Sequence, residues 1–283
     1  KKILQDYNYT ELEALVLSLG EKKFRAKQLY DWMHVKLVDS LDAMTNLSKS
    51  FREKLKESCY FTVLEAVQVL ESKVDGTCKF LFRIPEYEQV LKNNVIESVL
   101  MRYHHGNSVC ISSQVGCRMG CRFCASTLGG LERNLTAAEM LEQIYAITRE
   151  TGERVSNVVV MGTGEPLDNY DNLVRFIRLL TDESGLHISQ RNITVSTCGI
   201  VPMMYKLAEE RLQITLALSL HAPTDEKRRA LMPIAKKYSL REVMDACENY
   251  FSMTGRRISF EYALVGGLND NDVEARQLIS LIQ

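Results

Sequence analysis

Apolar residues recur every three to four positions through the first 58 residues, which is the spacing that gathers them on one face of an α-helix. The pattern is clear in TELEALVLSLG (10–20), which stops at Gly20, in KKFRAKQLYDWMHVK (22–36) and in SKSFREKLKES (48–58). A glycine directly after a periodic segment is a typical helix stop. Residues 1–58 are therefore predicted to form a small helical domain.

The segment 22–36 combines basic and aromatic side chains. It contains Lys22, Lys23, Phe24, Arg25, Lys27, Tyr30 and Trp32. If these residues share one helix, the helix suits contact with RNA, but a solvated basic face over an aromatic core face gives the same pattern. Two other basic segments, EKRR (226–229) and Arg256–Arg257, are each more typical of a solvated face.

Between residues 60 and 113 the pattern changes to alternating or β-branched apolar positions, which is typical of β-strands. The predicted strands lie in FTVLEAVQVLES (61–72), GTCKFLFRI (76–84) and NNVIESVLMRYH (93–104), with a hairpin turn at VDGT (74–77). Residues 59–106 are therefore predicted to be a short β extension. Glu97 lies in the third strand, and by itself reads as a solvent-facing carboxylate.

From residue 107 onward, predicted strands and helices alternate. The strands are predicted in SVCISS (108–113), VSNVVVMG (155–162), RNITVST (191–197), QITLALSLHA (213–222) and RRISFEYALV (256–265), and the helices near 136–150, 170–183, 202–210, 225–231 and 239–253. Repeated βα units predict an α/β fold with a parallel sheet, doubly wound or curved into a barrel. Sites in such folds are built at the C-terminal ends of the strands, where the loop CRMGCRFC (117–124) begins.

The composition is that of an ordinary globular protein. Of the 283 residues, 46% are hydrophobic and 25% are charged, and the formal net charge is −1. This net charge counts mildly against nucleic-acid binding through bulk positive charge, and it does not exclude a local basic face. No apolar run approaches the roughly 18 residues of a membrane span, and no signal peptide is recognisable. We expect a cytoplasmic protein whose eight cysteines are reduced.

Three cysteines, Cys117, Cys121 and Cys124, lie within eight residues. They suit a structural zinc ion, a four-cysteine electron-transfer cluster, or an iron–sulfur cluster with one open iron. The C-x3-C-x2-C spacing disfavours zinc, which usually binds two C-x2-C pairs, and Cys110 is a poor fourth ligand because it belongs to the preceding strand. The other four cysteines, at 59, 78, 198 and 247, are interpreted as core thiols.

A second candidate element, GTGEP, ends the next predicted strand with Gly162, Gly164 and Glu165. Glycines let the backbone approach a ligand closely, and a carboxylate can pair with an ammonium group. A tight turn that merely needs glycines gives the same pattern.

Four long segments carry a resemblance to a known family. They are CISSQVGCRMGCRFCASTLGGLERNLTAAE, VVMGTGEPLDNYDN, RNITVSTCGIVPMMYKLA and ALSLHAPTDEKRRALMPI. The chain resembles the RlmN/Cfr family of radical S-adenosylmethionine (SAM) RNA methyltransferases from FRAKQLYDWMH (24–34) to its end, and GTGEPLDN favours the RlmN side. The resemblance implies a partial (βα) radical SAM barrel at 107–283 behind the domains at 1–58 and 59–106. We expect the C-terminal part of this barrel to be missing.

The resemblance also implies the cofactors and their sites. A [4Fe–4S] cluster would be held by Cys117, Cys121 and Cys124, with SAM chelating the fourth iron. The SAM-binding residues implied are Gly164, Glu165, Ser196, Ser219, Leu220 and His221. For His221, a hydrogen-bonded histidine at the barrel rim explains the pattern equally well.

In the family, a methyl group passes from one SAM to a cysteine near the C-terminus, and a radical from a second SAM activates it for addition to C2 of adenosine. Glu97 matches the family's proton acceptor. Cys110 matches the cysteine that resolves the covalent RNA–protein intermediate. Because the methyl-accepting cysteine is expected outside this chain, the 283 residues alone are predicted to bind the cluster but not to methylate RNA.

The implied function is methylation of C2 of one adenosine in 23S rRNA and one in the tRNA anticodon loop. The implied partners are 23S rRNA, tRNA and an electron donor such as flavodoxin, with no membrane and a monomeric state. Two alternatives stay open: a Cfr-type enzyme that methylates C8, and a non-catalytic, metal-stabilised RNA-binding module.

Overall fold

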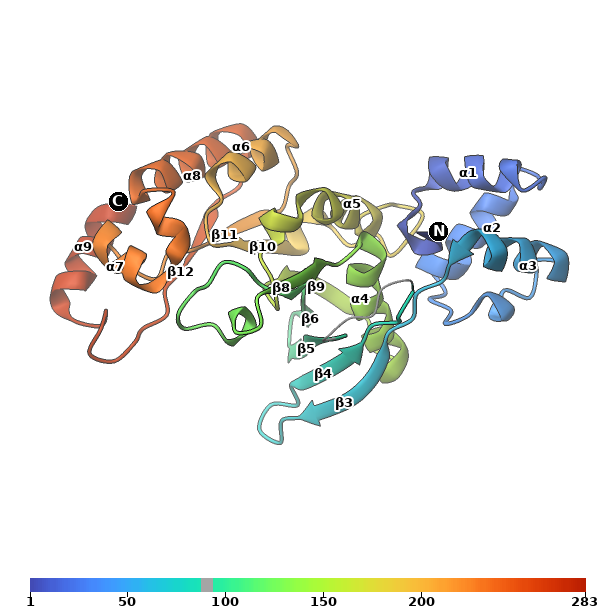
Figure 1. Cartoon of the computed structure of the whole chain (residues 1–283), viewed down its shortest axis with the longest axis horizontal. Coiled ribbons are helices and arrows are strands. Elements are labelled where there is room, and N and C mark those ends of the chain that lie inside the picture. The colour runs from blue at the N-terminus through green and yellow to red at the C-terminus, as the bar shows by residue number, and fades with distance from the viewer. Residues whose placement is uncertain (88–93) are drawn as a thin grey trace.

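The computed structural model of the chain describes residues 1–87 and 94–283, so Asn93, the first residue of one predicted strand, lies outside the described residues. The three helices expected in the first 58 residues are confirmed, and they lie together at one end of the molecule (Figure 1). This region contains β1 (Lys2–Ile3), η1 (Leu4–Asp6), α1 (Tyr9–Ser18), α2 (Arg25–His34), η2 (Leu41–Ala43), α3 (Lys49–Ser58) and β2 (Cys59–Tyr60).

Local sequence explains where these helices begin. The side chain of Asn8 accepts a hydrogen bond from the Glu11 backbone while Glu11 returns one, which is the reciprocal capping box. Ser48 caps α3 by accepting from the Phe51 amide at 3.2 Å. The apolar faces pack into a core of their own, which includes Leu12, Leu29, Phe51 and Leu55.

The predicted basic helix begins later than expected. Lys22, Lys23 and Phe24 precede α2, because the amides of Arg25 and Ala26 bond three residues back in a tight turn rather than four residues back in a helix. Arg25, Lys27, Tyr30 and Trp32 therefore share α2, but the other three residues do not. Tyr30 is buried in the core, whereas Lys22, Lys23 and Lys27 are exposed.

One eight-stranded sheet organises the rest of the described chain, in the order β12-β11-β10-β9-β6-β5-β4-β3. Its strands are β3 (Glu65–Glu71), β4 (Cys78–Arg83), β5 (Val95–Tyr103), β6 (Gly106–Ile111), β9 (Val155–Val160), β10 (Ile193–Thr197), β11 (Thr215–Ser219) and β12 (Ile258–Glu261). Strands β6 and β9 to β12 pair in parallel, while β3, β4 and β5 pair antiparallel and extend the same sheet. The predicted α/β class is confirmed.

The helices between the parallel strands match the predicted ranges closely. They are α4 (Ala137–Thr151), α5 (Tyr170–Leu180), α6 (Val201–Glu209), α7 (Asp225–Leu231) and α8 (Leu240–Thr254). A further helix, α9 (Asp272–Ile282), follows β12, and the short 3-10 helices are η3 (Ala125–Thr127), η4 (Pro166–Asn169), η5 (Gln190–Asn192) and η6 (Pro233–Lys236). Capping boxes begin α4 and α8, at Thr136 and Ser239. Among the described helices, none is long and apolar enough to cross a membrane.

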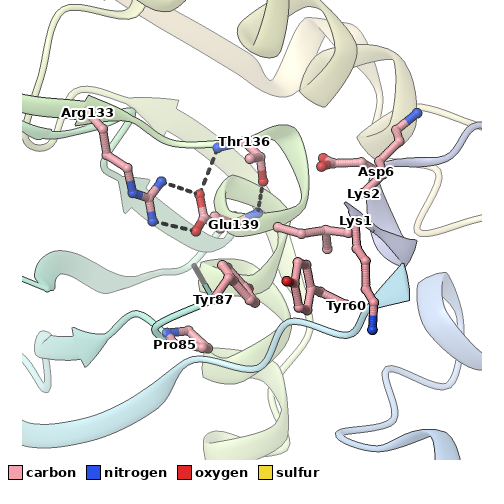
Figure 2. Close-up of a pocket in the computed structure, with 10 residues that line it drawn as sticks. Lys1, Lys2, Asp6, Tyr60, Pro85, Tyr87, Arg133, Thr136 and Glu139 are labelled. Atoms are coloured by element: carbon pink, nitrogen blue, oxygen red, sulfur yellow. Dashed lines mark hydrogen bonds and ion pairs between the residues drawn. The ribbon is translucent and has the colours of Figure 1, made fainter. Parts of the chain in front are cut away.

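The helical region meets the sheet at a polar junction (Figure 2). Arg133 donates two hydrogen bonds to the Glu139 carboxylate, at 2.7 and 2.8 Å, and the Thr136 amide donates a third at 2.9 Å. Asp6 accepts from the Ala138 amide at 2.7 Å, at the start of α4. A cavity of about 380 Å³ lies here, and its buried acids already have partners. These contacts explain how the two regions are joined.

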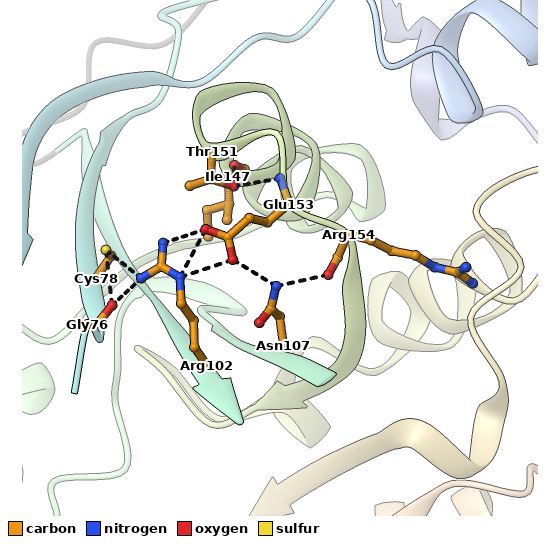
Figure 3. Close-up of polar contacts among 8 residues, drawn as sticks. All are labelled: Gly76, Cys78, Arg102, Asn107, Ile147, Thr151, Glu153 and Arg154. Carbon is orange, nitrogen blue, oxygen red and sulfur yellow. Dashed lines mark hydrogen bonds and ion pairs between the residues drawn. The ribbon is translucent and has the colours of Figure 1, made fainter. Parts of the chain in front are cut away.

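A second polar cluster ties the β3–β4 hairpin to the sheet (Figure 3). Arg102 of β5 forms a bidentate ion pair with Glu153, which follows α4, and also donates to the Gly76 carbonyl and the Cys78 thiol. Asn107 donates to the same carboxylate at 2.9 Å. The antiparallel extension is therefore anchored to the parallel part. The division into three domains stays a prediction.

Strand register brings the candidate residues onto one face of this sheet. Side chains at alternate positions of a strand share a face, and so do directly paired residues of neighbouring strands. Pairing of Val99 with Cys110 places Glu97 and Cys110 on the same face, and the chain of pairs through β9, β10 and β11 adds Ser196 and Ser219. The opposite face packs against helices in the main core.

Candidate active site

A cavity of about 200 Å³ lies where the cysteine loop meets the C-terminal ends of the parallel strands. Loop residues Cys117, Met119, Cys121, Phe123, Cys124 and Thr127 line it, as do Val160, Met161, Gly162, Gly164, Glu165, Pro166, Ser196, Cys198, Ser219, His221, Met232 and Glu261. Eight of the predicted site residues are thus brought together: the three cysteines, Gly164, Glu165, Ser196, Ser219 and His221.

The cysteine loop is bracketed by a hairpin that the hydrophobic pattern did not predict. Strands β7 (Gln114–Gly116) and β8 (Leu131–Asn134) pair antiparallel around it. The Cys117 amide donates to the Gly130 carbonyl at 2.9 Å, and the Thr127 hydroxyl donates to the Cys124 carbonyl at 2.9 Å. The loop backbone is therefore held at both ends, and its three cysteines line the cavity.

Burial favours the protonated thiols of Cys117 and Cys121. Burial raises the pKa of Cys117, and it raises the pKa of Cys121 to about 11. Thiolates, not thiols, bind metals, so metal uptake at this loop must release protons.

The donor set fits an iron–sulfur cluster better than a single ion. In the described part of the chain, no three Cys, His, Asp or Glu side chains converge closely enough to share one metal ion. A cluster distributes its cysteine ligands over separate irons, so its ligands do not need to converge on one point. Three thiols along one wall of a cavity therefore suit a cluster with one iron facing the cavity.

The glycines of the second element are required by close packing. A Cβ atom on Gly164, whose φ is +107°, would lie 2.6 Å from the Cβ of Gln114. A Cβ atom on Gly162 would lie 2.8 Å from the Ile111 carbonyl oxygen. Both positions therefore favour glycine whether or not a ligand is present.

Glu165 is buried and strongly hydrogen-bonded. Its carboxylate accepts from the Thr197 hydroxyl at 2.8 Å, the Cys198 amide at 2.8 Å and the Leu167 amide at 3.1 Å. Burial raises the pKa of Glu165, and these donors oppose that shift. The carboxylate fixes the end of β10, and a negative charge at this position can pair with an ammonium group.

Two serines at neighbouring strand ends share one acceptor. The hydroxyls of Ser196 and Ser219 donate to the same Glu261 oxygen, Oε2, at 2.8 and 2.9 Å. Sequence reasoning missed Glu261, which lies in the middle of the predicted strand RRISFEYALV but is the last residue of the observed strand β12. Its proximity depends on the pairing of Ser219 with Glu261 across β11 and β12.

His221 has a left-handed backbone, with φ of +57°. Its Nδ1 accepts a hydrogen bond from the Ala263 amide at 3.0 Å, so the proton of the neutral ring is on Nε2. Burial lowers its pKa. The ring packs edge-on against Phe123 of the cysteine loop, with centroids 4.8 Å apart. Leu220 is fully buried behind the cavity, and its amide donates to the Glu261 carbonyl.

Glu97 and Cys110 are not among the residues that line this cavity. Glu97 forms an ion pair with Lys79 at 2.6 Å, and about half of its side chain is exposed. Cys110 is partly buried, and burial raises its pKa to about 11. Both nevertheless lie on the sheet face that carries Ser196, Ser219 and Glu261.

One further residue contradicts its sequence interpretation, and a second has a position that the interpretation did not include. Arg228, expected on a solvated basic face, is completely buried. Cys198, interpreted as a core thiol, is buried but also lines the cavity. Both depend on how α7 and the end of β10 pack against the site, and no periodicity in the sequence encodes that contact.

Comparison with known proteins gives the family. The family described as the radical SAM superfamily matches residues 111–279, and the ribosomal RNA large subunit methyltransferase N-terminal domain matches residues 3–61. A protein of Lachnospira eligens named "Probable dual-specificity RNA methyltransferase RlmN" is 63% identical over 280 residues, covering 99% of this chain and 78% of that protein. One of the same name from Lachnoclostridium phytofermentans is 59% identical, covering 96% and 75%.

A solved structure agrees with this result. The crystal structure of a radical SAM methyltransferase from Sphaerobacter thermophilus superposes with a TM-score of 0.93 at 41% identity, covering 100% of this chain and 82% of that one. The predicted partial radical SAM barrel is thereby confirmed. The chain belongs to the RlmN family of radical SAM enzymes.

Proposed function

We propose that this chain is a radical SAM RNA methyltransferase that acts on C2 of one adenosine in 23S rRNA and one in the tRNA anticodon loop. Its family membership supports the proposal, because relatives with 63% and 59% identity are named dual-specificity RNA methyltransferases. The observation that carries it is one cavity shared by three loop cysteines and the ends of four parallel strands.

We assign Cys117, Cys121 and Cys124 to a [4Fe–4S] cluster. We assign SAM to a set of strand-end residues: Gly164, Glu165, Ser196, Ser219, Leu220 and His221. Bound together, the two cofactors supply one-electron cleavage of a sulfonium carbon–sulfur bond, which yields a radical able to abstract hydrogen.

The chain's own residues prepare this site before either cofactor binds. Glu165 is oriented by three donors and can accept a hydrogen bond from the SAM ammonium group. Glu261 accepts from both serine hydroxyls, which fixes their protons and leaves their lone pairs free to accept from a ligand hydroxyl.

Glu97 and Cys110 are assigned to the steps on the RNA. Glu97 is paired with Lys79 but half exposed, so a substrate can reach its carboxylate. Cys110 holds its proton firmly because burial raises its pKa to about 11. A thiol of this kind stays unreactive until a base removes its proton, which suits attack on a sulfur late in the reaction.

We also propose a cytoplasmic location, a monomeric state and a flavodoxin-like electron donor. The −1 net charge leaves RNA binding to local features, such as the exposed Lys22 and Lys23 before α2 and Lys27 within it.

Mass spectrometry of nucleosides tests the proposal. The gene for this protein is deleted in its host, and 23S rRNA and tRNA from deletion and parent strains are digested and compared. The proposal predicts that 2-methyladenosine disappears from both RNAs in the deletion strain and returns on complementation. Unchanged 2-methyladenosine contradicts it, and loss of 8-methyladenosine instead identifies a Cfr-type enzyme.

A further inference from the structure

Arg228 of α7 is a fully buried charged side chain directly behind the cavity. Its guanidinium donates to three backbone carbonyls at the ends of β10 and β11. The acceptors are Cys198, at 2.7 Å, Ser219, at 3.1 Å, and Leu220, at 3.2 Å. Since Cys198 and Ser219 line the cavity, Arg228 connects the two strand ends that form its wall.

This guanidinium has no carboxylate partner. No ion pair within the described residues includes Arg228, and its buried Nη1 has no hydrogen-bond partner there. An arginine side chain stays protonated in proteins, and burying a charge without a counter-ion is costly. Other partly buried arginines of this chain are paired, as Arg133 is with Glu139 and Arg149 with Glu142.

The cation lies next to the cavity that the three loop cysteines line. Its acceptors Cys198 and Ser219 line this cavity together with Cys117, Cys121 and Cys124. Cysteines bind metal as thiolates, so metal binding there brings negative charge toward a cation that lacks it.

We propose that Arg228 is a positioning residue for the cluster site: it holds the ends of β10 and β11 through their carbonyls, and its charge balances the negative charge of a cluster bound by Cys117, Cys121 and Cys124. This inference rests on the proposed function. It assigns Arg228 a role in setting how readily the cluster accepts an electron.

The sign of the effect follows from electrostatics. Reduction adds one negative charge to the cluster, and a fixed positive charge nearby stabilises the reduced form. Replacing Arg228 by a neutral residue therefore disfavours reduction. We expect the ratio of reduced to oxidised cluster at a fixed potential to fall about tenfold, which corresponds to a midpoint potential about 59 mV lower for a one-electron couple.

Two variants of Arg228 separate charge from shape. Arg228→Gln removes the charge but keeps two amide donors, whereas Arg228→Lys keeps the charge but loses the planar fork. Arg229→Gln is the matched control, because Arg229 is the exposed neighbour on the same helix. Each protein is reconstituted anaerobically with iron and sulfide. Iron per chain, the midpoint potential followed by electron paramagnetic resonance, and the melting temperature of the metal-free protein are then measured.

The proposal predicts that Arg228→Gln lowers the potential or fails to retain iron, while Arg228→Lys and Arg229→Gln match the wild type. Equal potentials in Arg228→Gln and the wild type overturn it, as do equal losses in the Gln and Lys variants. If both Arg228 variants lose the metal-free fold and Arg229→Gln does not, Arg228 is purely structural and the proposal fails. Failure of the wild type itself to take up iron contradicts the proposed function instead.

Discussion

Two polar regions of the molecule differ in whether their buried charged side chains have partners. At the junction between the helical region and the sheet, Glu139 forms an ion pair with Arg133 (Figure 2). Asp6 accepts a hydrogen bond from the Ala138 amide at the start of α4. At the cysteine cavity, Arg228 has no carboxylate partner among the described residues, and three cysteines line the same cavity. Satisfied polar groups indicate a structural contact, whereas an uncompensated charge beside potential ligands indicates a site that is completed by a cofactor.

The largest expected effect is the loss of iron from the cysteine cavity. Cys121→Ala removes one of three proposed cluster ligands, so iron per chain after anaerobic reconstitution should fall at least about tenfold, in line with the cost of losing metal-site residues. The metal-free protein should keep its fold, because Cys121 lies in a loop at the cavity rather than in the core.

Cys247→Ala is the matched control, since Cys247 is a buried thiol of the main core that does not line the cavity. Iron per chain and the visible absorbance of the iron–sulfur cluster are measured for both variants. Full iron retention in Cys121→Ala, or equal loss in Cys247→Ala, speaks against the assignment.

The next effect concerns the junction. Burial raises the pKa of Asp6 from 3.8 to about 6, partly opposed by its hydrogen bond from Ala138. A carboxyl group with a higher pKa in the folded than in the unfolded state binds its proton more tightly when folded. Its contribution to stability is therefore present below about pH 4 and lost as the pH rises through about 6, a change of about 3 kcal/mol.

Asp6→Asn should remove this component, because asparagine can still accept from the Ala138 amide but cannot ionise. The free energy of unfolding of the variant, measured by denaturant titration between pH 4 and pH 8, should fall less than that of the wild type. Asp245→Asn, on the exposed face of α8, serves as the control. Parallel pH profiles for Asp6→Asn and the wild type would show that ionisation of Asp6 does not lower the stability of the fold.

The smallest expected effect concerns the proposed SAM pocket. Glu261→Ala deprives the Ser196 and Ser219 hydroxyls of their shared acceptor, so both side chains lose their fixed orientation. We expect the SAM affinity of the cluster-loaded protein to fall about fivefold. This corresponds to a loss of about 1 kcal/mol of binding free energy, because the two hydroxyls are no longer oriented by a hydrogen bond. Isothermal titration calorimetry compares it with Glu248→Ala, an exposed glutamate of α8. Unchanged affinity would remove Glu261 from the pocket.

Local sequence was sufficient for most of the βα elements. Helices α4 and α8 begin at capping boxes and show clear periodicity, so their ranges were predicted to within about a residue. The hairpin β7–β8 was not predicted, because strands of three and four residues are too short to show alternation. The antiparallel extension was predicted as strands, but its membership of the same sheet depends on the pairing of β5 with β6.

The same limit applies to the site. The cysteine spacing and the GTGEP turn are local patterns, and the structure brings both to one cavity. Glu261 and Arg228 could not be identified in this way, since one depends on strand register and the other on how α7 packs. Arg228 lies in the run EKRR, whose local pattern indicates only exposed charge, whereas the fold buries one of its four residues completely.

Electron paramagnetic resonance of anaerobically reconstituted, dithionite-reduced protein, recorded with and without SAM, tests the central claim most directly. The account predicts a [4Fe–4S]⁺ signal that shifts when SAM is added, because three cysteines leave one iron open to the cavity. A signal that is indifferent to SAM, or a protein that binds zinc instead of iron, would contradict it.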